Sequence, residues 1–248
     1  MRWRGAKLTL FDIVPTMIIK LQRLLRRVPL DDPGRLIEDW AHGRNWVFKR
    51  VHEAKGYVAE GQVDGHDMRL EWGAPQRNYI SGRELRLRCE IGLPESLQML
   101  IISRGLSERL EDDAYARLTD GKQTEVKLDL PEETRWLTLY DSTGLDGVPM
   151  LGSRLVGVSN VEAQTRRWLE GELGLRLLRA CTGWLDADRP FVLMTLRGRL
   201  YLRTQVLGAD DGLGVQLLDS VVAIADSACA RALHLAGVKR PHKSGSSH

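Results

Sequence analysis

The stretch "GYVAEGQVDGHDMRLEWG" (56–73) decides the fold, because it predicts two antiparallel strands joined by a tight turn. A period of two is typical of a strand with one buried face. The second run shows this alternation of apolar and charged side chains in Met68, Arg69, Leu70, Glu71 and Trp72. Asp64-Gly65 separates the two runs and favours a two-residue hairpin turn, because both turn positions need a positive φ.

Two further runs extend the pattern downstream of this hairpin. "ELRLRCEI" (84–91) again alternates apolar and charged residues, which predicts a third strand with one buried face. "LQMLII" (97–102) lacks the alternation, as a more deeply buried strand would. The sequence therefore predicts a meander of four antiparallel strands. "SERLEDDAYARL" (107–118) has apolar residues four apart on one stripe, so we expect a helix that packs on this sheet.

The second half of the chain continues with strands and helices. We expect strands over 123–130 and 134–141, and then a loop over 141–153 that is dense in glycine and contains a proline. This loop is the expected boundary between two lobes. The segments expected beyond it are a strand over 154–159, a helix from Asn160 to about Ala180, strands over 191–196 and 199–206, and a helix from Leu213 to Ala236.

These elements place the chain in the α+β (mixed α/β) class, with mostly antiparallel sheets covered by helices and arranged in two consecutive lobes. The expected organisation has four parts: an N-terminal amphipathic basic helix segment (1–29), a lobe of antiparallel sheet plus helix (30–145), a strand-helix-hairpin-helix lobe (146–238), and a basic tail that ends in a tag-like remnant (239–248).

The basic residues are concentrated at the two ends of the chain. Residues 1–27 contain seven basic side chains and a single acidic one, Asp12, although the net charge of the whole chain is only +3. The body between the ends is therefore acidic. This distribution disfavours a nucleic-acid-binding domain, which places its basic residues on the folded face. The sequence has no run of about 18 apolar residues, so it predicts no membrane-spanning helix.

The positions of the cysteines and of two tryptophans in the sequence predict that these side chains are buried rather than part of a reactive or binding site. Cys89, Cys181 and Cys229 are far apart in the sequence and fall on predicted apolar faces, so we expect buried free thiols in a reducing cytoplasm. Trp40 and Trp46 are also expected to be buried, although their spacing in "WAHGRNW" would suit a recognition surface. The predicted location is cytoplasmic, with peripheral contact at the inner membrane surface as an extension of it.

The first candidate binding site is the amphipathic segment "TMIIKLQRLLRR" (16–27). On a helical projection its apolar residues fall in one arc and its basic residues on the opposite side, with Ile19 as the exception. Three roles fit this pattern: packing on the protein's own sheet, lying on an anionic membrane surface, and binding a partner protein. The residues expected to make the contact are Met17, Ile18, Lys20, Leu21, Arg23, Leu24, Leu25, Arg26 and Arg27.

The second candidate is a polar surface built around the hairpin region. Its arginine excess suits an anion or an acidic partner, and the connection "APQRNYISGR" (74–83) can shape the site. The residues of this candidate surface are Arg69, Arg77, Tyr79, Arg83, Arg86 and Arg88. The alternative is a solvated ladder in which Arg69, Arg86 and Arg88 meet Glu71 and Glu90 across neighbouring strands.

No sequence pattern for catalysis or metal binding stands out. The histidines share no ligand spacing, and no serine has a nucleophile-elbow context. We therefore expect no metal and no cofactor. The enzyme alternative is a site assembled from scattered residues of the first lobe, which would bring together two or more of His42, His52, His66, Arg69, Glu71 and Arg88.

The sequence thus predicts a non-enzymatic cytoplasmic binding or assembly protein. Its basic N-terminal helix would contact a partner protein or an anionic membrane surface. An enzyme with a scattered site is the first alternative, and a nucleic-acid-binding module that stacks bases on aromatic and arginine side chains is the second. The sequence leaves open whether the chain forms a homo-oligomer.

Overall fold

The computed structural model describes residues 33–51, 56–119, 130–143, 145, 149–161, 164–206 and 214–238. The chain divides into two units, Met1–Asp32 and Pro33–His248, and the described residues all belong to the second. The predicted N-terminal helix, most of the predicted strand over 123–130 and the basic tail 239–248 lie outside the described residues. The predicted division of Pro33–His248 into two lobes stays a prediction.

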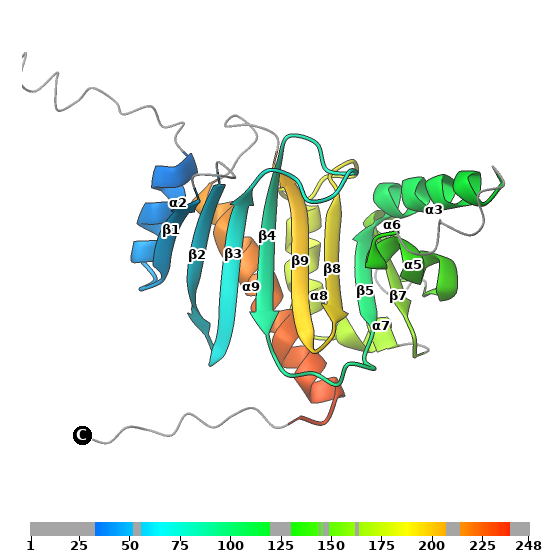
Figure 1. Cartoon of the computed structure of the whole chain (residues 1–248). Coiled ribbons are helices and arrows are strands. Elements are labelled where there is room, and N and C mark those ends of the chain that lie inside the picture. Colours follow the sequence, from blue (N-terminus) through cyan, green and yellow to red (C-terminus); the bar gives the residue numbers. More distant parts are fainter. Residues whose placement is uncertain are drawn as a thin grey trace, which may run out of the picture. The chain divides into compact units, whose positions relative to one another are not determined.

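The described elements follow one another along the chain as strands and helices in mixed order (Figure 1). The strands are β1 (Val47–Val51), β2 (Gly56–Val63), β3 (His66–Gly73), β4 (Arg83–Glu90), β5 (Met99–Ser103), β6 (Ser142–Thr143), β7 (Leu155–Ser159), β8 (Phe191–Leu196) and β9 (Arg199–Val206). The helices are α2 (Pro33–His42), α3 (Arg104–Thr119), α5 (Glu132–Leu139), α6 (Pro149–Arg154), α7 (Gln164–Trp168), α8 (Glu172–Cys181) and α9 (Val215–Leu235).

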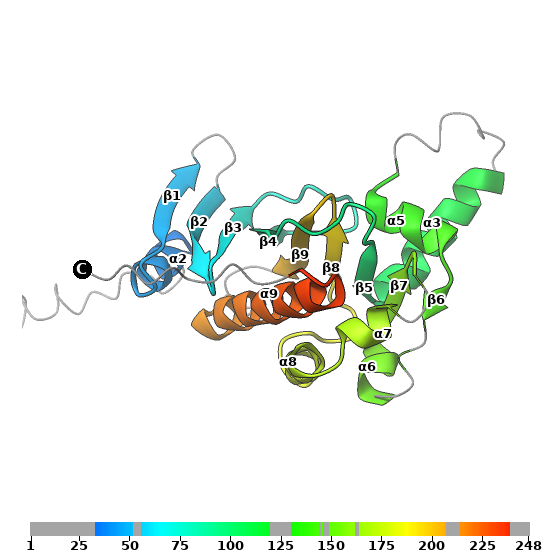
Figure 2. The same ribbon diagram turned by 90° about the horizontal axis from the view of Figure 1, so that it is seen from below.

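All nine described strands form one antiparallel sheet, in the order β1-β2-β3-β4-β9-β8-β5-β7-β6 (Figure 1; β6 is labelled in Figure 2). The expected α+β class with an antiparallel sheet is confirmed. The hairpin expected at 56–73 is confirmed as well, since Asp64 and Gly65 have φ values of 49° and 84°. The β8–β9 hairpin turns in the same way at Arg197 and Gly198, with φ values of 51° and 78°.

The predicted four-strand meander is wrong in its last member. β9 pairs with β4, and β5 lies two strands further on, between β8 and β7. The reason is burial on both faces: Leu100 and Ile102 point to one side and Ile101 to the other, and all three are fully buried. A strand buried on both faces needs helices on both sides of the sheet, and here both sides are covered over β5 and β7 but not over β1–β4.

Three further segments differ from the sequence prediction. The loop expected over 141–153 contains β6 and most of α6. Residues 134–141, predicted as a strand, lie mostly in helix α5, because Pro131 and the acidic Glu132 and Glu133 start a helix that also buries Trp136. The single helix expected over 160–180 is divided into α7 and α8. Gly171, with φ +77°, breaks it, because the left-handed conformation cannot continue an α-helix.

One face of the sheet is covered along its length by α2, α6, α7, α8 and α9 (Figure 2). We call it the core face. Leu70, Leu87 and Leu202 of the sheet belong to the apolar cluster on this face, together with Val221 and Ala225 of α9. Trp40 and Trp46 also lie in it, and their rings meet edge to face with centroids 5.2 Å apart. The three cysteines are free and buried, as the sequence predicts.

Helices cover only part of the opposite face. α3 and α5 lie over β5 and β7 (Figure 2). They bury a second apolar cluster that contains Leu100, Ile102, Val156, Val158, Val192, Met194, Leu106, Leu110 and Trp136. Among the described residues, the neighbouring strands β1–β4 and β9 carry mainly charged side chains on this side.

Candidate functional site

We call this part of the sheet the open face. It consists of the side chains of β1–β4 and β9 that point away from the core face. Strand register places eleven charged groups on it: Lys49, Glu60, Asp67, Arg69, Glu71, Glu84, Arg86, Arg88, Glu90, Arg199 and Arg203. Six are basic and five are acidic, so the surface is nearly neutral.

Strand pairing brings like charges directly opposite each other in several places. Arg69 faces Arg88 across β3 and β4, and Arg86 faces Arg203 across β4 and β9. Like charges directly opposite destabilise a sheet by about 0.2–1 kcal/mol. The carboxylates around these arginines must therefore offset the repulsion.

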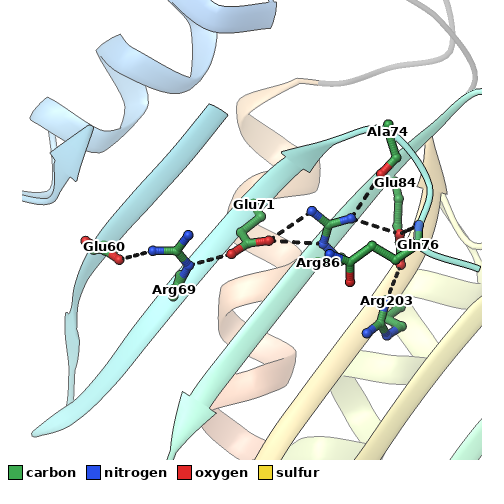
Figure 3. A network of polar contacts seen from close by, with 8 residues as sticks. All are labelled: Glu60, Arg69, Glu71, Ala74, Gln76, Glu84, Arg86 and Arg203. Atoms are coloured by element: carbon green, nitrogen blue, oxygen red, sulfur yellow. Dashed lines mark hydrogen bonds and ion pairs between the residues drawn. The ribbon is translucent and has the colours of Figure 1, made fainter. Parts of the chain in front are cut away.

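A continuous ladder of ion pairs supplies these carboxylates. It runs Glu60, Arg69, Glu71, Arg86, Glu84, Arg203 (Figure 3), and we call these six residues the charge ladder. Arg86 Nη2 lies 2.9 Å from Glu71 Oε2, and Arg203 Nη1 lies 2.6 Å from Glu84 Oε1. Each arginine of the ladder thus donates to at least one glutamate, which holds its guanidinium plane in a fixed orientation.

Glu84 anchors one end of the ladder. Its side chain is fully buried, and it accepts hydrogen bonds from Arg86, Arg203 and the backbone N–H of Gln76. A buried carboxylate is stable only when its charge is paired and its oxygens accept hydrogen bonds. The buried carboxylate of Glu84 therefore holds the guanidinium groups of Arg86 and Arg203 in place. The other residues of the ladder, Glu60, Arg69 and Glu71, are partly exposed to solvent.

The ladder favours the charged form of its carboxyl groups. Hydrogen bonds from Lys49 and then Arg69 lower the pKa of Glu60 below its ordinary value. Burial, the largest single influence, raises the pKa of Glu71, but the hydrogen bonds from Arg69 and Arg86 outweigh it and the net pKa is lowered. Both carboxyl groups therefore keep their negative charge to a lower pH than a free glutamate side chain does.

The far end of the open face is less fully paired. Here Arg88 and Arg199 share one carboxylate, that of Glu90, with Arg199 Nε at 2.7 Å and Arg88 Nε at 3.2 Å, and the side chains of all three residues are nearly half exposed. Next to them lies a shallow hollow of about 360 Å³. Its lining is Glu60, Gly61, Gln62, Asp67, Met68, Arg69, Arg88 and Glu90.

The connection between β3 and β4, residues 74–82, ties the open face to the covered part of the sheet. Arg77 Nε lies 2.6 Å from Glu133 of α5, and the hydroxyl of Tyr79 donates to the same carboxylate. Burial raises the pKa of Glu133, but Arg77 and then Tyr79 lower it more, so the net pKa is below its ordinary value. Burial and the adjacent Glu133 raise the pKa of Tyr79.

The six residues predicted as an anion or acidic-partner surface therefore separate into three groups. Arg69, Arg86 and Arg88 lie on the open face, each beside at least one glutamate. Arg77 and Tyr79 bind the buried Glu133. The sixth residue, Arg83, points to the core face, where its guanidinium lies 4.9 Å from the centroid of Trp72. This geometry matches the ladder alternative, and the anion site stays a prediction.

Sequence reasoning missed Glu84 and Arg203 as parts of this surface. Alternation within "RLYLRTQV" does place Arg203 on the same side as Arg199. What the sequence does not show is that β9 pairs with β4, because the two strands are far apart in the chain. The nine residues predicted as the N-terminal contact lie outside the described residues.

The structure brings three residues of the enzyme alternative to one surface, and two of them, Arg69 and Arg88, line the shallow hollow. Arg69, Glu71 and Arg88 lie on the open face, whereas His66 points to the core face and is buried. The fifth, His42, ends α2 and is exposed. His52 lies outside the described residues. Among the residues that the structure describes, no three His, Cys, Asp or Glu side chains gather as metal ligands.

None of the helices in the described part of the chain is long and apolar enough to span a membrane.

Comparisons with known proteins give one structural likeness. No protein-family model matches the sequence, and no curated protein matches it. The fold is similar to the crystal structure of the mycobacterial trehalose monomycolate transport factor A, TtfA, with 11% sequence identity and a TM-score of 0.47. The match covers 85% of this chain and 98% of that chain.

Proposed function

We propose that this chain is a non-enzymatic binding protein and that the open face is its docking surface for a partner protein. The observation that carries the proposal is the charge ladder, a row of arginines and glutamates fixed across β2, β3, β4 and β9 (Figure 3). Groups that are already held in place lose little conformational entropy when a partner binds, and this lowers the cost of association.

The size of the open face supports a protein partner. Four of the five strands have eight residues and β1 has five. At about 3.3 Å per residue and about 4.8 Å between strands, they give a face of roughly 600 Å². A standard protein interface uses about 800 Å² per partner. The face is therefore large enough to provide most of one side of an interface, and much larger than a small ion needs.

The charge pattern supports a partner with both signs of charge. Basic and acidic groups are interspersed on the open face, and a complementary pattern on a partner gives specificity and correct register. A nucleic acid would need a continuous basic face. The carboxylates of Glu60, Glu71 and Glu90 interrupt any such face among the described residues.

The basic segment 16–27 has a separate part in this proposal. It adds a second contact to the same partner, through the apolar and basic residues named from the sequence, Met17 to Arg27. An anionic membrane surface is the competing target, and vesicle binding distinguishes the two.

Photocrosslinking in the native cells tests the proposal. A photoreactive amino acid is placed at Gln62 or Arg88 on the open face, and, as a control, at Leu175, which is 51% exposed on α8 under the core face. We expect adducts with one defined polypeptide at positions 62 and 88 and none at 175. Adducts at 175 with the same polypeptide, or no adducts at 62 and 88, would contradict the proposal.

A further inference from the structure

β1 (Val47–Val51) is the last strand at one end of the sheet. It pairs with β2, and no described strand lies beyond it. The outer backbone groups of an edge strand can pair with another chain. Two large apolar residues on this edge are strongly exposed: Val47 is 58% exposed and Val51 is 37% exposed.

The positive charges of β1 are paired with carboxylates of the same chain. Charged side chains on an edge strand normally discourage pairing. Here Lys49 Nζ lies 2.6 Å from Glu60, and Arg50 Nη2 lies 2.9 Å from Glu38 of α2. Each positive charge is thus already engaged by a carboxylate of its own chain, which weakens the protection that it would give.

We propose that β1 pairs antiparallel with β1 of a second copy of this chain, centred on Lys49. The five residues "VFKRV" are self-complementary in this register. Val47 faces Val51 of the second copy on the open-face side, and Phe48 faces Arg50 of the second copy on the other side. Arg50 already lies 5.7 Å from the centroid of its own Phe48, so an arginine beside this ring is a geometry that the strand adopts.

The register also contains one unfavourable contact. Lys49 faces Lys49 of the second copy on the twofold axis, and like charges opposite each other destabilise a sheet. Glu60 of each copy offsets this repulsion. Because only five residues per chain pair, the association is expected to be weak and to depend on protein concentration. The two sheets become continuous, and both open faces lie on the same side.

Sedimentation velocity over a range of concentrations tests the pairing. We expect the wild-type chain to form a dimer as concentration rises. Val47→Lys with Val51→Lys should remain a monomer, because each introduced lysine faces another one. Val47→Lys with Val51→Glu should dimerise again, because opposite charges then face each other across the twofold axis. Circular dichroism checks that both variants keep the fold.

Cysteine cross-linking tests the register itself. Lys49→Cys lies on the axis and should form a disulfide-linked dimer when a copper–phenanthroline oxidant removes the two thiol hydrogens. Val47→Cys alone should not cross-link, whereas a mixture of Val47→Cys and Val51→Cys should. The native cysteines are buried and do not interfere. A wild-type chain that stays monomeric at every concentration, or a lysine double variant that dimerises like wild type, would overturn the proposal.

Discussion

The two halves of one sheet face are built in opposite ways. Over β5, β7 and β8 the side chains on this face are apolar, and helices α3 and α5 cover them. Over β1–β4 and β9 they are mostly charged, and ion pairs join them across the strands. The boundary runs between β9 and β8, where Arg203 faces Val192 and Tyr201 faces Met194. Neighbouring strands of one sheet thus change from charged to apolar at a single step.

The contrast between the two halves indicates that the covered half stabilises the fold and that the open half is suited to recognition. The covered half gains stability from buried apolar surface, at about 25 cal/mol per Å². Exposed ion pairs of the open half contribute only about 0–1 kcal/mol each. The open half can therefore change its charges at little cost to folding, which suits a binding surface, whereas the covered half cannot.

The largest effect is expected in the covered half. Trp136 of α5 is 3% exposed and packs in the second apolar cluster, so Trp136→Ala should destabilise the fold by about 4 kcal/mol. Urea denaturation measures the change. The matched variant in the open half is Arg88→Ala, which should change the free energy of unfolding by less than about 1 kcal/mol. Similar losses in the two variants would show that the halves do not differ as described.

A smaller effect is expected where the open half does contain a buried charge. Glu84→Gln removes the carboxylate that engages Arg86 and Arg203, which leaves two largely buried guanidinium groups without it, and should cost about 3 kcal/mol. The control is Glu90→Gln at the exposed end of the same surface, expected to cost less than about 1 kcal/mol. A cost below 1 kcal/mol for Glu84→Gln would remove its role as the anchor.

Acid should weaken the open half and its connection to α5. The pKa values of Glu60, Glu71 and Glu133 are lowered in the folded protein. Groups of this kind stabilise the fold above the carboxyl pKa of the unfolded chain, and the contribution is lost as pH falls through the folded pKa. Urea denaturation should therefore show stability that declines below about pH 4.5. Glu133→Gln should decline less steeply, and an unchanged slope would contradict the pKa shift of Glu133.

The smallest effect on stability is expected from removing residues 1–32. The nine-stranded sheet and the two apolar clusters described above are built from residues of Pro33–His248, so the thermal unfolding midpoint of the remaining chain should change little. Co-sedimentation with vesicles that contain anionic lipid should leave both the full and the shortened chain in the supernatant. If only the full chain sediments with the vesicles, the segment 16–27 contacts a membrane and not the partner.

The sequence predicts the individual strands and turns of this fold better than it predicts which strands lie side by side in the sheet. Alternation and the Asp64-Gly65 turn specify the β2–β3 hairpin, because register there is set within a few residues. The position of β5 depends on the burial of both its faces by helices that come later in the chain. The local sequence of β5 does not predict its neighbours in the sheet. Residues 134–141 alternate like a strand, but Pro131 and two glutamates start a helix there.

The candidate surface was predictable to a similar extent. Arg69, Arg86 and Arg88 follow from alternation alone, and so does their position on a polar face. Their actual partners do not. Glu84 became an anchor because β9 brings Arg203 beside it and the 74–82 connection covers it, and both depend on pairing between distant segments.

The most direct test of the open face as a docking surface compares two charge reversals for binding to the polypeptide identified by crosslinking. Arg88→Glu with Arg199→Glu changes the exposed end of the open face, and Arg176→Glu changes an exposed ion pair on α8. We predict that the first variant binds at least about tenfold more weakly and that the second binds like wild type. Equal affinity of both variants and the wild type would contradict the account.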